Sequence, residues 1–182
     1  MKAQKDYQMD IKQMEKGPLE IERKFLIRIP DLDLLEQLCA KRISIVQTYL
    51  ATEKNMSRRI RKQECRGEIR YRYNEKEKVS AMTRIEREHE ITEEEYQELM
   101  KEAVSGAKTI RKTRYVLPAG DLCFEIDVFP EWEDRAFAEV ELKSEDQSFE
   151  FPSCLTLIKE VTCDSRYTNH ALAINGFVYD EI

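Results

Sequence analysis

The sequence has little of what marks membrane, secreted or zinc-bound proteins. No apolar run approaches the roughly 18 residues needed to cross a bilayer, and the first residues, MKAQKDYQMDIKQMEK, lack the apolar stretch of a secretory signal. The five cysteines are odd in number and none lie in a Cys-x-x-Cys pair, which argues against a disulfide framework and a zinc site. We therefore expect a cytoplasmic protein with reduced thiols and no membrane partner.

An excess of basic charge is also absent. The 30 Lys and Arg residues are outnumbered by 36 Asp and Glu, so the formal net charge is −6 and a broad basic surface for duplex nucleic acid is not expected. Charge of both signs is nevertheless abundant, at 36% of residues against about 25% in an average globular domain. The charges are interleaved with Ile, Val, Leu, Tyr and Phe, which favours ordered structure over disorder.

The length of 182 residues suits one domain. Residues 1–17 show little periodicity and precede Pro18, so we expect a flexible N-terminal arm followed by a single domain at 18–182. Helices are predicted at 31–41, where Leu32, Leu35 and Leu38 share a face, at 92–104, and near 167–173. Thr92 and Glu95 resemble a capping box. Strands are predicted at 19–29, 43–52, 56–63, 67–76, 79–91, 108–118, 121–130 and 135–144.

Charged side chains alternate with apolar ones along many of these strands, so that one sheet face is charged. Glu20, Glu22 and Lys24 share a face of the first strand. Later strands repeat the pattern with Arg84, Glu86, Glu88 and Glu90, with Lys112 and Arg114, with Glu125 and Asp127, and with Glu139, Glu141 and Lys143. A sheet with one solvated face is the commonest cause of such alternation.

Two features favour a closed barrel instead. Many strands of similar length would leave edges that closure removes, and the helices need an apolar sheet face to pack on, which leaves the charged face for the interior. The predicted fold class is α+β, mainly β: an eight-stranded antiparallel closed barrel with helices packed outside. Because desolvated ions cost several kcal/mol each, such an interior must be wet, internally paired and occupied by charged ligands. A polyanion with metal ions meets this requirement.

The first strand opens with Glu20-Ile21-Glu22-Arg23-Lys24, which resembles the ExExK signature of the CYTH, or triphosphate tunnel metalloenzyme, family. The resemblance continues in family order through 59–61, 84–88, 112–115, 124–127 and 138–141, and it closes at 160–162 with Arg166, Tyr167 and Asn169, as in short bacterial members. In the fourth strand, Tyr73 and Asn74 stand where members often have Leu and Thr, although Lys76 can take the place of the family's lysine. The family implies an eight-stranded tunnel whose members hydrolyse triphosphates, while one class converts ATP to cyclic AMP.

The resemblance also implies roles for individual residues. The expected substrate-binding residues are Lys24, Arg59, Arg61, Arg84, Lys112, Arg114 and Arg166. Lys24, Lys76, Arg59 and Arg61 are also expected to act in catalysis. Mg²⁺ or Mn²⁺ is the expected cofactor, with Glu20, Glu22, Glu139 and Glu141 as ligands. Glu86, Glu88, Glu125 and Asp127 either complete a second metal site or orient the basic side chains, and the sequence leaves both open. His89 and His170 are expected to be structural or exposed.

The leading hypothesis is metal-dependent hydrolysis of a triphosphate, above all inorganic tripolyphosphate. A class IV-type adenylate cyclase is the alternative enzyme, but the sequence shows no motif for binding adenine. A non-catalytic polyphosphate- or nucleotide-binding module is the other alternative, and the paired carboxylates argue against it because anion binding alone gains nothing from them. The substrate among the triphosphates and the oligomeric state stay open.

Overall fold

The computed structural model describes residues 19–52, 56–80 and 83–181. The strands are β1 (Leu19–Arg28), β2 (Lys41–Leu50), β3 (Met56–Cys65), β4 (Glu68–Lys78), β5 (Thr83–Ile91), β6 (Ile110–Ala119), β7 (Leu122–Val128), β8 (Arg135–Leu142) and β9 (Leu157–Glu160). The predicted N-terminal arm lies outside the described residues.

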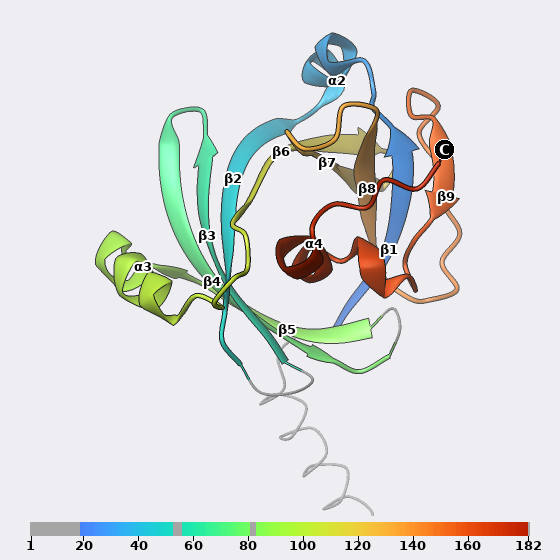
Figure 1. Cartoon of the computed structure of the whole chain (residues 1–182). Helices are drawn as coiled ribbons and strands as arrows, with labels where there is room; N and C mark the ends of the chain where they lie inside the picture. The colour runs from blue at the N-terminus through green and yellow to red at the C-terminus, as the bar shows by residue number, and fades with distance from the viewer. Residues whose placement is uncertain (1–18, 53–55, 81–82, 182) are drawn as a thin grey trace, which may run out of the picture.

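The strands form an antiparallel barrel (Figure 1). Neighbours pair in the order β5-β4-β3-β2-β6-β7-β8-β1, and β1 returns to β5 through pairs such as Glu20 with Arg84. This last pairing closes the ring, which confirms the predicted eight-stranded closed barrel. The short strand β9 pairs with the second half of β1, beyond the part that pairs with β5. It was not predicted, because its four residues are too few to show an alternation.

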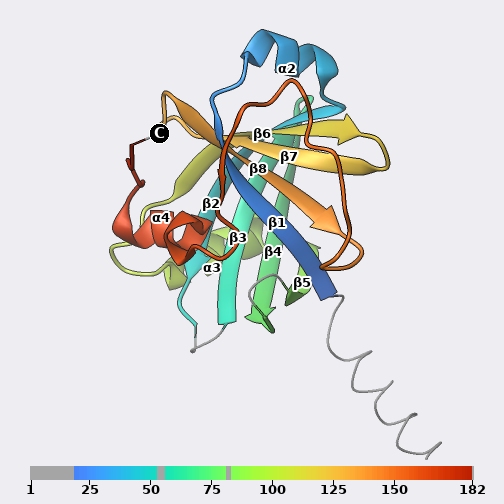
Figure 2. The ribbon, with the colours of Figure 1, turned by 90° about the vertical axis from the view of Figure 1, so that its right-hand side faces the viewer.

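The inner face of the barrel changes character along the strands. Leu26 follows Lys24 on the inner face of β1, and Phe137 precedes Glu139 on the inner face of β8, because alternate residues share a face. Both apolar side chains belong to a buried cluster that also holds Tyr49, Ile110, Phe129, Tyr167, Leu172 and Ala173. The last two belong to α4 (Asn169–Asn175), which lies within the ring in Figure 1 and at one end of the barrel in Figure 2. The interior is therefore charged in its middle and apolar at the end that α4 fills.

The other two α-helices lie on the outside of the barrel, as predicted (Figure 1). The helix α2 (Leu32–Leu38) buries Leu35 against the outer apolar face, which also holds Phe124 and Ile126. The predicted three-leucine face is only partly used, since Leu32 and Leu38 remain 41% and 47% exposed. This helix also ends short of the predicted residue 41, because β2 already begins there.

The helix α3 (Glu93–Leu99) begins with the capping box predicted from the sequence. The Glu95 backbone N–H donates to the Thr92 hydroxyl at 3.1 Å, and the Thr92 N–H donates to the Glu95 carboxylate at 2.8 Å. Tyr96 packs this helix against Leu50 and Ile60 of the barrel. A 3₁₀ turn, η1 (Met100–Glu102), replaces the last part of the predicted helix 92–104.

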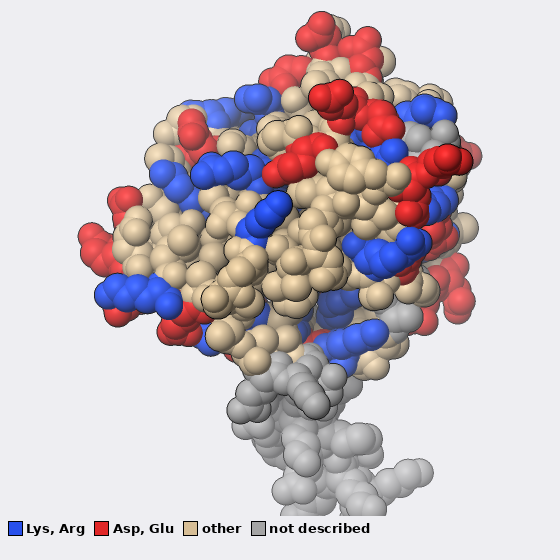
Figure 3. Space-filling model, in the orientation of Figure 1, with Lys and Arg blue, Asp and Glu red and all other residues tan. Residues whose placement is uncertain are grey.

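Charges of both signs are interspersed over the face of the molecule shown in Figure 3. Uncharged residues occupy the centre of this face, where α4 lies in Figure 1. Within the described ranges, no helix combines the length and the apolar character that a membrane crossing requires.

Candidate active site in the barrel interior

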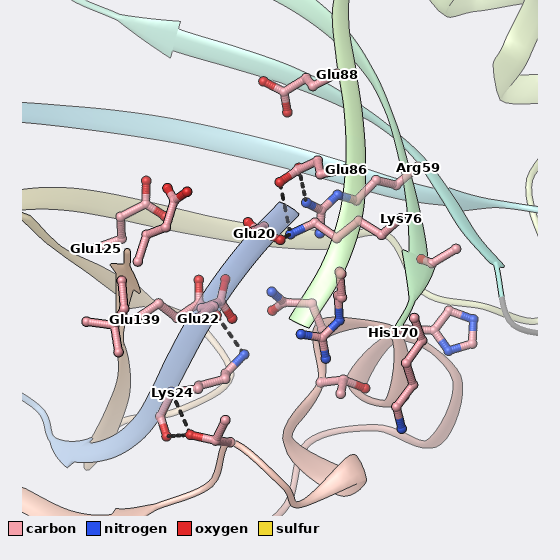
Figure 4. Close-up of a pocket in the computed structure, with 18 of the residues that line it drawn as sticks. Glu20, Glu22, Lys24, Arg59, Lys76, Glu86, Glu88, Glu125, Glu139 and His170 are labelled. Carbon is pink, nitrogen blue, oxygen red and sulfur yellow. Dashed lines mark hydrogen bonds and ion pairs between the residues drawn. The ribbon is translucent and has the colours of Figure 1, made fainter. Parts of the chain in front are cut away.

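A cavity of about 1080 Å³ occupies the barrel interior and gathers most of the predicted site residues. Its charged lining includes Glu20, Glu22, Lys24, Arg59, Arg61, Lys76, Arg84, Glu86, Glu88, Arg114, Glu125, Glu139 and Glu141. Figure 4 shows Glu20 of β1 beside Lys76 and Glu86, with Glu22 of β1 and Glu139 of β8 lying apart from them on the other side of the view. Lys112, Asp127 and Arg166, also predicted as site residues, do not line this cavity.

The pairing of β1 with β8 places one pair of opposite charges and one pair of like charges on neighbouring strands. Lys24 is directly opposite Glu139, and its Nζ lies 2.8 Å from a carboxylate oxygen of Glu139. Burial acts to raise the pKa of Glu139, but the charges of Lys24 and Arg114 outweigh it, so this pKa lies well below its ordinary value. Glu139 is therefore a carboxylate already neutralised by basic neighbours.

Glu22 has the opposite environment. It is paired across the strands with Glu141, another carboxylate, and no cation forms an ion pair with it in the described part of the chain. Burial, reinforced by the charge of Glu139, raises the pKa of Glu22. A cation bound between Glu22 and Glu141 would offset this repulsion.

Glu20 and Glu86 form a second carboxylate pair beside Lys76. The ammonium group of Lys76 contacts Glu20 and lies 3.4 Å from Glu86. Burial raises the pKa of Glu20 to about 7, although the charge of Lys76 acts to lower it. The pKa of Glu86 is lowered to about 2, because the charge of Lys76 and the hydrogen bond between Glu86 and Glu20 outweigh the effect of burial. The pKa values of the two acids are therefore moved apart, as happens when like-charged carboxylates lie in contact.

The donor chemistry of these acids fits Mg²⁺ or Mn²⁺. Hard divalent ions prefer carboxylate oxygens, and Mg²⁺ typically takes one or two carboxylates together with waters and substrate phosphates. No group of three His, Cys, Asp or Glu side chains within 19–52, 56–80 and 83–181 is arranged to hold a metal ion by itself. A metal site with one or two protein carboxylates, completed by substrate oxygens, agrees both with the ligands that Mg²⁺ prefers and with the lack of a three-residue ligand group in the described ranges.

Basic side chains from β3 crowd the opposite wall. Arg61 donates from Nε to the Gln47 side chain at 2.9 Å and lies 3.4 Å from Glu88, while Arg59 lies 3.7 Å from Glu86. Burial, together with the charges of Arg59 and Arg114, lowers the pKa of Arg61 to about 10. An anion entering the cavity would relieve this repulsion between guanidinium groups.

A buried ion network lies beneath this wall. The side chains of Lys112 and Asp127 are both 0% exposed and form an ion pair. Asp127 also accepts hydrogen bonds from Arg114 Nε and Nη2 at 2.7 Å each, and Arg114 Nη2 donates to Glu139 at 2.9 Å. Arg114 therefore reaches the cavity in a fixed orientation, with Lys112 and Asp127 behind it.

Arg166 does not line the cavity, whereas Tyr167 lines it but has its hydroxyl group bound elsewhere. The Arg166 side chain is 56% exposed and forms ion pairs with Asp164 at 2.7 Å and Asp180 at 3.3 Å. The Tyr167 ring is fully buried, and its hydroxyl donates to Asp180 at 2.9 Å. His89 and His170 are exposed and line the cavity, and His170 packs edge-on against Tyr49 at 4.9 Å between ring centroids.

Polar residues to which the sequence analysis gave no role at the site also reach the cavity region. Gln47 is fully buried and donates to the Tyr49 hydroxyl at 2.9 Å, and Tyr49 lines the cavity, as does Asn169, which the sequence analysis named only as part of the family resemblance. Alternation along β2 places Gln47 and Tyr49 on one face, which is the signal that could have indicated them.

A family model described as the CYTH domain matches residues 18–153. This chain belongs to the CYTH domain family. The crystal structure of the inorganic triphosphatase NE1496 is 32% identical to this CYTH protein, with a TM-score of 0.54, and the match covers 85% of this chain and 94% of that one.

More distant solved structures share the fold. PH1819 from Pyrococcus horikoshii OT3 is 17% identical with a TM-score of 0.55, and a conserved hypothetical protein from Pyrococcus furiosus is 24% identical with a TM-score of 0.51. Each match covers 70% of this CYTH protein and 80% of the other chain. No curated protein matches the chain.

Proposed function

We propose that this CYTH protein hydrolyses a triphosphate, above all inorganic tripolyphosphate, with Mg²⁺ or Mn²⁺ in the barrel interior. The observation that carries the proposal is the cavity itself, where crowded basic side chains face carboxylates that lack a cation. The similarity to NE1496, described as an inorganic triphosphatase, supports the same activity.

The basic wall suits the oxygens of a triphosphate. Guanidinium groups bind phosphate oxygens through two parallel hydrogen bonds, and ammonium groups act as point charges. We assign the substrate contacts to the basic side chains that line the cavity, namely Lys24, Arg59, Arg61, Lys76, Arg84 and Arg114. Lys112 would act indirectly, since it supports Asp127 and so the orientation of Arg114.

The metal would be held by acids from β1 and β8. Glu22 and Glu141 suit this role, and Glu20 would join them once the ion displaces Lys76 from it, while Glu139 is already engaged by Lys24 and Arg114 and would contribute less. When bound, the ion would neutralise carboxylate and phosphate charge and act as a Lewis acid on a phosphate oxygen.

The remaining acids are better suited to orienting the basic residues than to a second metal. Glu86 contacts Arg59 and Lys76, Glu88 contacts Arg61, and Asp127 holds Arg114. Glu125 also forms an ion pair with Arg114. Each acid thus already has a basic partner.

The reaction requires no Ser, Cys or His nucleophile. A water molecule attacks the terminal phosphorus as the bond to the bridging oxygen breaks, which gives phosphate and pyrophosphate. The lysines and arginines of the cavity would stabilise the negative charge that develops on the leaving oxygen.

A screen of purified protein with tripolyphosphate, ATP and thiamine triphosphate, each with Mg²⁺, Mn²⁺ or EDTA, tests this proposal. We expect metal-dependent release of phosphate. Cyclic AMP as the main product from ATP would favour a cyclase, and binding of all three compounds without any turnover would favour a non-catalytic binding module.

A further inference from the structure

The helix α4 brings a buried polar side chain to the cavity from outside the range that the CYTH family model matches. Asn169, the first residue of α4, lines the cavity beside His170, which is labelled in Figure 4. It is only 8% exposed, and its Oδ1 has no hydrogen-bond partner among the described residues. The neighbouring side chains of α4 that are most buried, Leu172 and Ala173, pack instead into the apolar end of the barrel.

An unpaired buried amide oxygen destabilises the folded state, because it has lost its hydrogen bonds to water without gaining others. Most buried polar groups in native proteins are paired, and the exceptions concentrate at functional sites. Among the described residues, no hydrogen bond ties the Asn169 amide to the protein, so its NH₂ is available to a ligand in the cavity.

The position of Asn169 is fixed by contacts on both sides of α4. The Lys108 backbone N–H donates to the Ala173 carbonyl at 2.8 Å. After α4, Gly176 turns the chain with a φ of 88°, and the tail is held by hydrogen bonds from Trp132 Nε1 to the Val178 carbonyl at 3.1 Å and from Arg135 to the Asp180 carbonyl at 2.8 Å. The backbone of α4, which carries Asn169, is thus held in place by the rest of the fold.

The charged residues of the cavity offer only one kind of hydrogen bond each. Lysine and arginine only donate, and ionised glutamate only accepts, whereas an amide does both without adding charge. Phosphate oxygens of a fully ionised triphosphate only accept, so they need the amide NH₂.

We propose that Asn169 is a substrate-binding residue whose Nδ2 donates a hydrogen bond to a phosphoryl oxygen of the triphosphate. This assignment rests on the proposed triphosphate hydrolysis and adds a contact from the C-terminal segment. It also explains why an amide is kept at the boundary between the charged and apolar parts of the interior.

The test compares Asn169→Leu, which has similar size but no polar atoms, with the wild type. Loss of a hydrogen bond to a charged oxygen should lower kcat/KM for tripolyphosphate with saturating Mg²⁺ by about tenfold or more. The midpoint of thermal unfolding without ligand should stay the same or rise, because the unpaired oxygen is gone. A residue with a purely structural role would show the reverse pattern, a lower midpoint with activity that falls only as folded protein is lost.

Two further variants control this comparison. Asn169→Asp keeps the size but removes the donor and adds a negative charge, so kcat/KM should fall at least as far. Asn175→Asp makes the same change at an exposed position at the end of α4 and should leave kcat/KM within about twofold of the wild type.

Calorimetric binding of pyrophosphate with Mg²⁺ gives a readout that does not depend on turnover. We expect weaker binding to Asn169→Leu than to the wild type. Activity of Asn169→Leu within about twofold of the wild type would overturn the assignment, as would a lower unfolding midpoint that accounts for the lost activity. If the wild type hydrolyses no triphosphate, the proposed function fails. The Asn169 assignment is overturned separately if both proteins bind pyrophosphate with equal affinity, or if neither binds it.

Discussion

The buried ion network behind Arg114 should make Asp127 and Lys112 unequal in their contributions to stability. Asp127 neutralises two buried cations, because it pairs with Lys112 and accepts two hydrogen bonds from Arg114. Asp127→Asn keeps the shape but leaves the fully buried ammonium group without a counter-charge, and breaking a buried pair in this way costs about 3–5 kcal/mol. Lys112→Met leaves Asp127 still bound to Arg114, so we expect a smaller loss, of about 1 kcal/mol.

Urea denaturation with linear extrapolation measures both values as changes in the free energy of unfolding. Glu68→Gln provides the control, since Glu68 pairs with Arg70 at the surface, where their side chains are 65% and 47% exposed, and should change stability by less than about 0.5 kcal/mol. A loss for Lys112→Met equal to that for Asp127→Asn would refute the asymmetry. So would an Asp127→Asn variant as stable as the Glu68→Gln control.

Three further outcomes are expected. EDTA should abolish turnover and added Mg²⁺ should restore it, because carboxylates and a triphosphate repel each other in one cavity without a cation; phosphate release measures both. The kcat/KM for tripolyphosphate should exceed that for ATP at equal free Mg²⁺, since the charged lining suits phosphate oxygens; a higher value for ATP would contradict this. Asp180→Ala removes the acceptor of the Tyr167 hydroxyl, 2.9 Å away, together with the ion pairs to Lys159 and Arg166, and should lower the free energy of unfolding measured in urea; an unchanged value would show that these contacts do not anchor the tail.

The barrel was predictable because alternate residues of a strand point to the same face of the sheet, so the sequence pattern shows which side chains share an environment. Charged residues at every second position of β1, β5, β7 and β8 indicated a shared inner face, and closure followed from the number of similar strands. The predicted ends of the helices were less accurate, as in α2, because the local sequence pattern does not show at which residue the next strand begins. The strand β9 was missed because pairing with β1, rather than any internal pattern, defines it.

Most of the charged site was predictable for the same reason, and the exceptions show the limit of the rule. Alternation places Lys112 on the inner face but cannot show that Asp127 and Arg114 cover it. The rule also applies to Leu26 and Phe137, which continue the inner rows of β1 and β8, yet only the structure shows that they meet and that α4 packs on them. Asn169 became visible as a site residue only through this long-range packing.

The most direct test of the account is the initial rate of phosphate release from inorganic tripolyphosphate at saturating Mg²⁺, for the wild type and for Glu22→Gln. Glu22 faces Glu141 without a cation, so the variant keeps the shape of the cavity while removing one metal-binding charge. The account predicts turnover by the wild type and a rate lower by about tenfold or more in the variant, which requires only about 1.4 kcal/mol of lost transition-state stabilisation. No phosphate release by the wild type, or equal rates at both saturating and subsaturating Mg²⁺, would contradict it.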